Sequence, residues 1–165
     1  MSRLQISPKT ITLRPRTSAD EAFLCLAYET SRDEEFKDVD WQSSSQREGF
    51  FRHQFDSQEL HFASTYPGAD YDIIEYKKEP IGRLVLSWET DQLHCIDIIL
   101  LPGFRKKKFG TAIMNAITKE ADRLHIPASL FFERWKPYLE PFYESYGFKT
   151  KKEHPAHFYM ERERR

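Results

Sequence analysis

The residues with the clearest potential for chemistry lie in the segment GFRKKKFGT, residues 103–111, between an apolar run and an amphipathic pattern. Pro102 cannot continue a hydrogen-bonded strand, so we expect the apolar run to end near Leu101. A helical pattern begins near Lys108 or Phe109, and the first-turn amides of such a helix have no intrahelical partners. Those amides, the helix dipole and the cationic side chains of this segment favour the binding of an anion.

Charge and spacing alone leave two interpretations of this segment open. Either its backbone amides bind phosphate, with Gly110 allowing close approach and the Thr111 hydroxyl donating a further hydrogen bond, or it is a solvated basic loop before a core helix. The nucleotide-binding patterns GxxxxGK[ST] and GxGxxG are both missing from the sequence. A phosphate site at this position is therefore of another kind.

The composition predicts a single ordered domain spanning residues 1–165, because 165 residues fit one domain and 39% of them are hydrophobic. The 25 basic and 26 acidic side chains leave a net charge of −1, which argues against a protein dedicated to nucleic acids. The histidines show no spacing typical of a metal site, so we expect no metal.

The same sequence favours a cytoplasmic location without a membrane partner. Its first residues contain no apolar segment typical of a signal peptide, and its apolar runs are too short to span a bilayer. The two cysteines, Cys25 and Cys95, lie in apolar surroundings and are expected to be free thiols.

Hydrophobic periodicity predicts the elements that must position the basic segment. Strand patterns cover residues 9–15, 71–76, 81–88, 93–101, 127–133 and 154–163. Helical patterns cover residues 17–29, 43–62, 109–124 and 141–148, and the last of these helices is stopped by Gly147. Ser18 and Glu21 have the spacing of a capping box, and Ser43 to Ser45 offer alternative caps. With one further strand between the last helix and residue 154, the predicted order is β-α-α-β-β-β-α-β-α-β-β, an α/β (α+β) fold with helices packed on a mixed sheet.

The C-terminal half of the chain resembles the GNAT superfamily of N-acetyltransferases. The hallmark of this family is a strand, then the motif [QR]-x-x-G-x-[GA] entering a helix, then another strand and a Y-E-x-x-G-F segment. Residues 93–148 carry these parts in order, with Arg105 and Gly110 at the first and last motif positions. Lys106 and Lys108 stand where members have glycine, and RWKP lacks the asparagine that often precedes the last helix.

The resemblance implies a mostly antiparallel central sheet that splays between its fourth and fifth strands, with acetyl-CoA in the gap. Main-chain groups of Ile98, Ile99 and Leu100 would then bind the pantetheine arm. The pyrophosphate would be held by the next segment, which comprises Arg105, Lys106, Lys107, Lys108, Phe109, Gly110 and Thr111. Backbone amides can do this without glycine, provided that no positive φ is required.

The resemblance also implies that an amine attacks the thioester directly, and neither cysteine is placed as a nucleophile. A thiol has a pKa of about 8.5 and a tyrosine one of about 10, so a phenol can protonate the departing thiolate. Tyr143 occupies the position of the general acid in many members, and Glu133 that of a general base in some. The alternatives are a packed aromatic for Tyr143 and a paired surface carboxylate for Glu133. Other possible bases are Asp97, His94, Glu89 and a relayed water.

The acceptor implied by the resemblance is an amine of unknown identity, and a homodimer is common in the family. The acidic loop before the second helix either attracts a cationic amine or is simply solvated; its members are Asp33, Glu34, Glu35, Asp38 and Asp40. The replaced motif glycines and the missing asparagine favour a second function, a catalytically degenerate GNAT fold that binds CoA or a protein partner.

Overall fold

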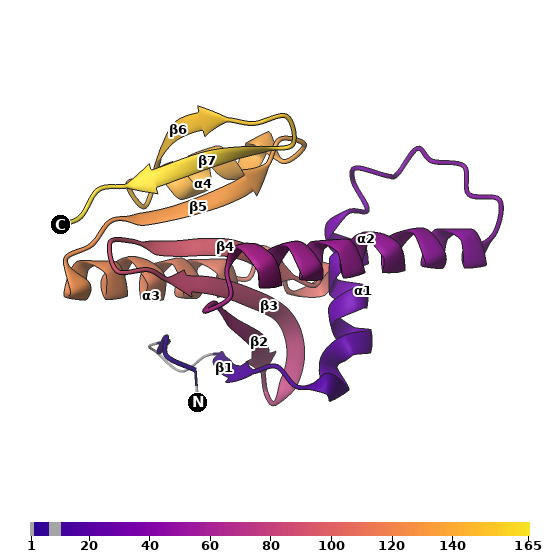
Figure 1. Ribbon diagram of the computed structural model, residues 1–165, viewed down its shortest axis with the longest axis horizontal. Coiled ribbons are helices and arrows are strands. Elements are labelled where there is room, and N and C mark those ends of the chain that lie inside the picture. The colour runs from indigo at the N-terminus through magenta and orange to yellow at the C-terminus, as the bar shows by residue number, and fades with distance from the viewer. Residues whose placement is uncertain (1, 7–10) are drawn as a thin grey trace.

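The computed structural model describes residues 2–6 and 11–165, which form a seven-stranded mixed sheet with helices on both faces (Figure 1). The predicted order of elements is confirmed, although residues 9 and 10 of the first predicted strand lie outside the described part. The elements are β1 Thr12–Pro15, α1 Glu21–Ser31, α2 Ser44–Thr65, β2 Asp70–Tyr76, β3 Glu79–Trp88, β4 Leu93–Leu100, α3 Phe109–Leu124, β5 Ala128–Glu133, α4 Glu140–Glu144, β6 Lys149–Glu153 and β7 His157–Arg162.

The sheet has the strand order β1-β2-β3-β4-β5-β7-β6. Neighbouring strands are antiparallel except β4 and β5, which run parallel. Residues 93–95 of β4 pair with residues 128–130 of β5, and the remaining residues of the two strands have no ladder partner in each other. The predicted splay between the fourth and fifth strands is therefore confirmed, and Figure 1 shows the two strands separating.

Helices α1 and α2 cover one face of the sheet and pack against each other. Ser43 caps α2, because its side-chain oxygen accepts a hydrogen bond from the Gln46 amide at 3.0 Å. The buried side chains that join the two helices to the sheet are Leu24, Tyr28, Phe51, Phe55 and Ile73.

The capping box lies one residue earlier than predicted, at the 3-10 turn Ser18–Asp20 that leads into α1. Thr17 and Asp20 form it in place of Ser18 and Glu21, and the Thr17 amide donates to the Asp20 carboxylate at 2.8 Å. Arg14 donates two hydrogen bonds of 2.8 Å to the same carboxylate. This pairing with β1 holds Asp20 at the cap, and it depends on a contact that local spacing does not reveal.

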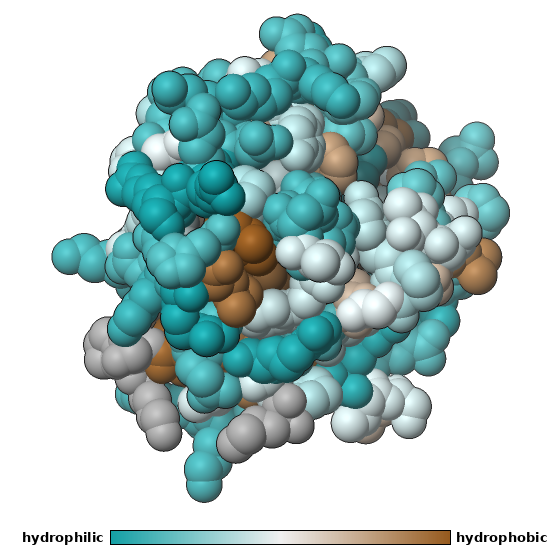
Figure 2. All heavy atoms as spheres, turned by 60° about the vertical axis from the view of Figure 1, so that its left-hand side comes forward, coloured by the Kyte–Doolittle hydropathy of each residue, from teal (hydrophilic) through white to brown (hydrophobic). Residues whose placement is uncertain are grey.

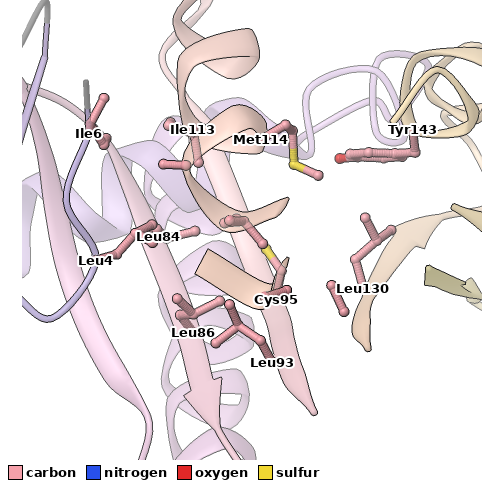
Figure 3. Close-up of a cluster of buried hydrophobic side chains, with 14 of the residues drawn as sticks. Leu4, Ile6, Leu84, Leu86, Leu93, Cys95, Ile113, Met114, Leu130 and Tyr143 are labelled. Carbon is pink, nitrogen blue, oxygen red and sulfur yellow. The ribbon is translucent and has the colours of Figure 1, made fainter. Parts of the chain in front are cut away.

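Helices α3 and α4 cover the opposite face and form the larger core (Figure 3). The core side chains labelled in that view come from six segments: Leu4, Ile6, Leu84, Leu86, Leu93, Cys95, Ile113, Met114, Leu130 and Tyr143. Burying each aliphatic side chain contributes about 1.5–3 kcal/mol to stability. The N-terminal residues Leu4 and Ile6 were not predicted to be part of the fold, yet they are only 3% and 7% exposed.

A buried arginine ties α2 to the centre of the sheet. Arg83 of β3 is 2% exposed, and its guanidinium donates to Asp97 on β4 at 2.8 Å. It also donates to Gln58 and Glu59 of α2 at 2.6 Å each. Burial acts to lower the pKa of Arg83, but the charges of Asp97 and Glu59 outweigh it and raise that pKa overall. The network holds β4 in place just before the strand segment that faces the splay.

The outer surface is mostly polar. Figure 2 shows a face that is largely hydrophilic, with a small group of hydrophobic residues near its centre and a few others toward its edges. Among the helices of the described residues, none has the length and apolarity needed to cross a membrane.

Candidate functional site

A cavity of about 740 Å³ opens where β4 leaves β5. It is bounded by the end of β4, the basic segment, the first turn of α3 and the segment around α4. Its predicted lining residues are Ile98, Ile99, Leu100, Arg105, Lys106, Lys108, Gly110, Thr111 and Tyr143. The structure thus brings most of the predicted site residues together around one hollow.

A bulge in β4 turns the strand away from β5 at the edge of this cavity. Val85 pairs with Asp97 while Leu86 pairs with Cys95, so Ile96 is the extra residue on β4. The bulge directly precedes the residues whose backbone faces the gap. On the side where β5 has departed, the main-chain groups of these residues have no ladder partner in β5.

Gly82 on β3 allows β4 to approach closely on the other side. A Cβ atom at Gly82 would lie 2.0 Å from the carbonyl oxygen of Ile99, so no other residue fits there without moving β4. Gly82 pairs with Leu100 in the sheet. Gly82 thus helps to position β4, and this role was not predicted from the sequence.

The basic segment uses left-handed backbone conformations at both positions where GNAT members have glycine. Lys106 has a φ of 57° and Lys108 a φ of 66°. The condition stated for binding phosphate without glycine, that no positive φ is required, is therefore not met at these two positions. Lysine adopts the conformation that glycine would adopt, at a cost of about 1–2 kcal/mol for each residue.

The basic side chains of this segment have different surroundings. The Arg105 guanidinium donates to the Leu100 carbonyl at 2.9 Å and lies 3.5 Å from the Thr30 carbonyl at the end of α1. Lys107 and Phe109 do not line the cavity. The Lys107 amine lies 5.9 Å from the centre of the Phe104 ring. Phe109 packs against Tyr76, and the ring centres are 5.0 Å apart.

We expect Lys108→Gly to raise the free energy of unfolding by about 1 kcal/mol, because glycine adopts a positive φ without steric strain. Lys107→Gly is the matched control, since Lys107 is not among the residues with positive φ. This control should lower the free energy of unfolding by up to about 1 kcal/mol through added chain entropy. Urea denaturation of both variants measures the difference. Equal shifts in the same direction would contradict the strain at Lys108.

Tyr143 projects from α4 toward the middle of the core, with its hydroxyl directed at Met114 of α3 (Figure 3). The side chain is 5% exposed, and its ring packs between Phe132 at 5.8 Å and Phe142 at 5.3 Å. Burial raises the pKa of Tyr143 well above its usual value. The phenol therefore stays protonated at neutral pH, which is the state of a proton donor.

Glu133 does not line the cavity, and its carboxylate lies 3.6 Å from the amine of Lys136, which does. The other carboxylates and the histidine considered as bases are held elsewhere. Asp97 is paired with Arg83, and Glu89 accepts a hydrogen bond from Gln92 at 2.7 Å. His94 is buried against Ser129, with 2.7 Å between the ring nitrogen and the hydroxyl, and burial lowers its pKa to about 4.

The acidic loop between α1 and α2 neutralises most of its own charge. Asp33 pairs with Arg47 at 3.2 Å, Glu34 with Lys37 at 2.9 Å and Glu35 with Arg32 at 2.5 Å. These ion pairs weaken the interpretation that the loop attracts a cationic acceptor electrostatically. Within residues 2–6 and 11–165, no three metal-ligating side chains come together as a metal site.

Five further cavity residues were not predicted: Ser31, Lys136, Tyr138, Leu139 and Phe142. Leu139 and Phe142 precede Tyr143 by four residues and one residue, so α4 and its approach form one wall. Because Leu139 lies one helical turn before Tyr143, it could have been predicted from the sequence to line the same wall. Ser31 comes from α1, and only the tertiary structure brings it to the cavity.

A sequence model described as the acetyltransferase (GNAT) family matches residues 27–148, which include β4, the basic segment and α4. The chain belongs to the GNAT family of acetyltransferases. The family indicates acyl transfer as the general activity. No sequence match to this GNAT chain is found among curated proteins.

Solved structures with the same fold include several acetyltransferases. The PaiA N-acetyltransferase of Thermoplasma acidophilum, in complex with coenzyme A, has a TM-score of 0.68 at 18% identity over 93% of this chain and 98% of that one. A GCN5-related N-acetyltransferase of Rhodopseudomonas palustris has a TM-score of 0.64 at 20% identity over 98% and 99%. A GNAT acetyltransferase of Elizabethkingia anophelis with acetyl-CoA bound has a TM-score of 0.60 at 14% identity over 94% and 99%. At sequence identities of 20% or less, the similarity to these structures shows that the chain has the same fold.

Proposed function

We propose that this GNAT protein transfers an acetyl group from acetyl-CoA to the nitrogen of an amine by direct attack. The observation that carries the proposal is one cavity that joins three features: the part of β4 that has no partner in β5, the cationic segment that leads into α3, and Tyr143. A pantetheine arm can bind along Ile98–Leu100 while the pyrophosphate lies at the N-terminal end of α3. The PaiA and Elizabethkingia structures, with coenzyme A and acetyl-CoA bound, support this use of the fold.

Two residues carry the proton transfers: Tyr143 on the cavity wall and Glu133, which lies outside the wall beside Lys136. Glu133, next to Lys136, takes a proton from the acceptor ammonium so that a neutral amine attacks the thioester carbon. Tyr143 gives its phenolic proton to the thiolate that leaves. Burial raises the pKa of the Cys95 thiol to about 12, so this cysteine is not an acyl carrier, in keeping with direct transfer.

A binding-only protein is the second candidate, because lysine replaces two motif glycines. The Tyr143 phenol on the cavity wall favours the enzyme over this candidate, because binding alone needs no proton donor. The left-handed conformations of Lys106 and Lys108 keep the loop amides available at a strain cost, which supports CoA binding by either candidate. A decayed loop would be free to relax into unstrained conformations.

A screen of amines with a free-thiol readout tests the proposal. Small primary amines, amino acids, polyamines and lysine-containing peptides are each incubated with the protein and acetyl-CoA. At least one class should release thiol faster than acetyl-CoA without an amine. Tight binding of acetyl-CoA with no amine-dependent thiol release in any class would establish the binding-only candidate instead.

A further inference from the structure

Three lysine amines line the cavity, and one of them, Lys136, lies outside the basic segment. Lys136 lies in the turn between β5 and α4 and lines the cavity together with Ile98–Leu100 and Tyr143. Its side chain is 15% exposed. By contrast, Lys106 and Lys108 of the same cavity are exposed, and they lie in the segment assigned to the phosphates.

Lys136 also has a proton acceptor beside it. The Lys136 amine lies 3.6 Å from the Glu133 carboxylate, and the Glu133 side chain is 30% exposed. The Glu133 carboxylate is thus a base within reach of this amine, directly or through one water molecule. Lys136 therefore combines the features of an acceptor amine with those of a cavity wall.

We propose that Lys136 is acetylated by the chain's own acetyl-transfer site, an inference that rests on the proposed function. Because Lys136 belongs to the same cavity as the bound thioester, its amine attacks at a high effective concentration. The nitrogen of Lys136 forms a bond to the acetyl carbon, and the carbon–sulfur bond breaks. The ammonium gives up two protons in this step: one replaces the proton that Tyr143 donates to the thiolate, and the other passes through Glu133 to water. The products are N-acetyl-lysine and the free thiol of CoA.

Acetylation removes the positive charge of Lys136 and its ion pair with Glu133. The acetyl group also fills part of the cavity. The modified chain should therefore transfer acetyl groups to external amines at a different rate from the unmodified chain. The first turnover, on Lys136, would in this way alter the rate of later turnovers.

Intact-mass analysis of the full chain with acetyl-CoA and no added amine tests this inference. One acetyl group should accumulate, peptide mapping should place it on Lys136, and its rate should not depend on protein concentration. Lys136→Arg keeps the ion pair with Glu133 and should reduce the singly acetylated fraction at least about tenfold. Lys119→Arg, at an exposed position of α3, should leave that fraction unchanged. Circular dichroism verifies that both variants fold.

Three results would overturn the inference. Acetyl groups spread over surface lysines and unchanged in Lys136→Arg would show chemical acetylation in solution. A rate that rises with protein concentration would show transfer between molecules. No acetyl group on Lys136, together with amine-dependent thiol release in the acceptor screen, would refute self-acetylation and leave the proposed function standing.

Discussion

Tyr143→Phe is expected to lower the rate of acetyl transfer by about 100- to 10,000-fold, the usual contribution of a positioned general acid. The affinity for acetyl-CoA should stay nearly unchanged, because phenylalanine keeps the ring that packs against Phe132 and Phe142. The change removes the phenolic proton that the thiolate would take. Stability should hardly fall, since the hydroxyl makes no hydrogen bond to another described side chain.

The effect of Tyr143→Phe is measured as kcat by thiol release and as the dissociation constant of acetyl-CoA by calorimetry. Tyr146→Phe is the matched control, because Tyr146 lies on the same segment and packs against Phe142 at 5.4 Å but does not line the cavity. The control should keep its kcat. Full activity of Tyr143→Phe across pH would refute the acid role and leave Tyr143 as a packed aromatic.

Arg83→Met is expected to lower the free energy of unfolding by about 3–5 kcal/mol. Arg83 is 2% exposed and neutralises Asp97 and Glu59, so its loss leaves two carboxylates without their buried cation. Glu59 keeps an ion pair with Arg16, whereas Asp97 sits on β4 next to the bulge. We therefore expect most of the loss to come from Asp97.

A double variant separates lost charge pairing from lost packing. Arg83→Met combined with Asp97→Asn should recover more than half of the stability lost in Arg83→Met, because the unpaired charge is then gone. Urea denaturation of the wild type, the two single variants and the double variant completes the cycle. A loss below about 1 kcal/mol in Arg83→Met would mean that the network is no more than a surface pair.

The sequence predicted the elements well where a strong periodic pattern was present. Residues 109–124 were predicted as an amphipathic helix, and α3 spans Phe109–Leu124. The splay was predicted through resemblance, since no local pattern marks the point where β4 leaves β5. The place where β4 leaves β5 depends on the bulge at Ile96 and on the close approach of β4 to Gly82. Both features arise from pairing between β3 and β4, which the local sequence does not show.

The site was predicted less completely than the fold, for a physical reason. Residues next to each other in the basic segment could be grouped by spacing, but a cavity is formed by segments distant in the chain. Ser31 and Lys136 reach it from α1 and from the turn after β5. Side-chain direction was also hidden: the backbone amide of Phe109 belongs to the predicted phosphate site, and the sequence does not show that its ring packs against Tyr76.

Calorimetric titration of acetyl-CoA into the wild type and Thr111→Glu tests most directly whether this cavity is the cofactor site. Thr111 lines the cavity in the first turn of α3, where a carboxylate suits the helix dipole but repels phosphate. The variant should therefore stay folded and lose acetyl-CoA binding, while the wild type binds one acetyl-CoA per chain. Equal binding by both proteins, or no binding by the folded wild type, would contradict the account.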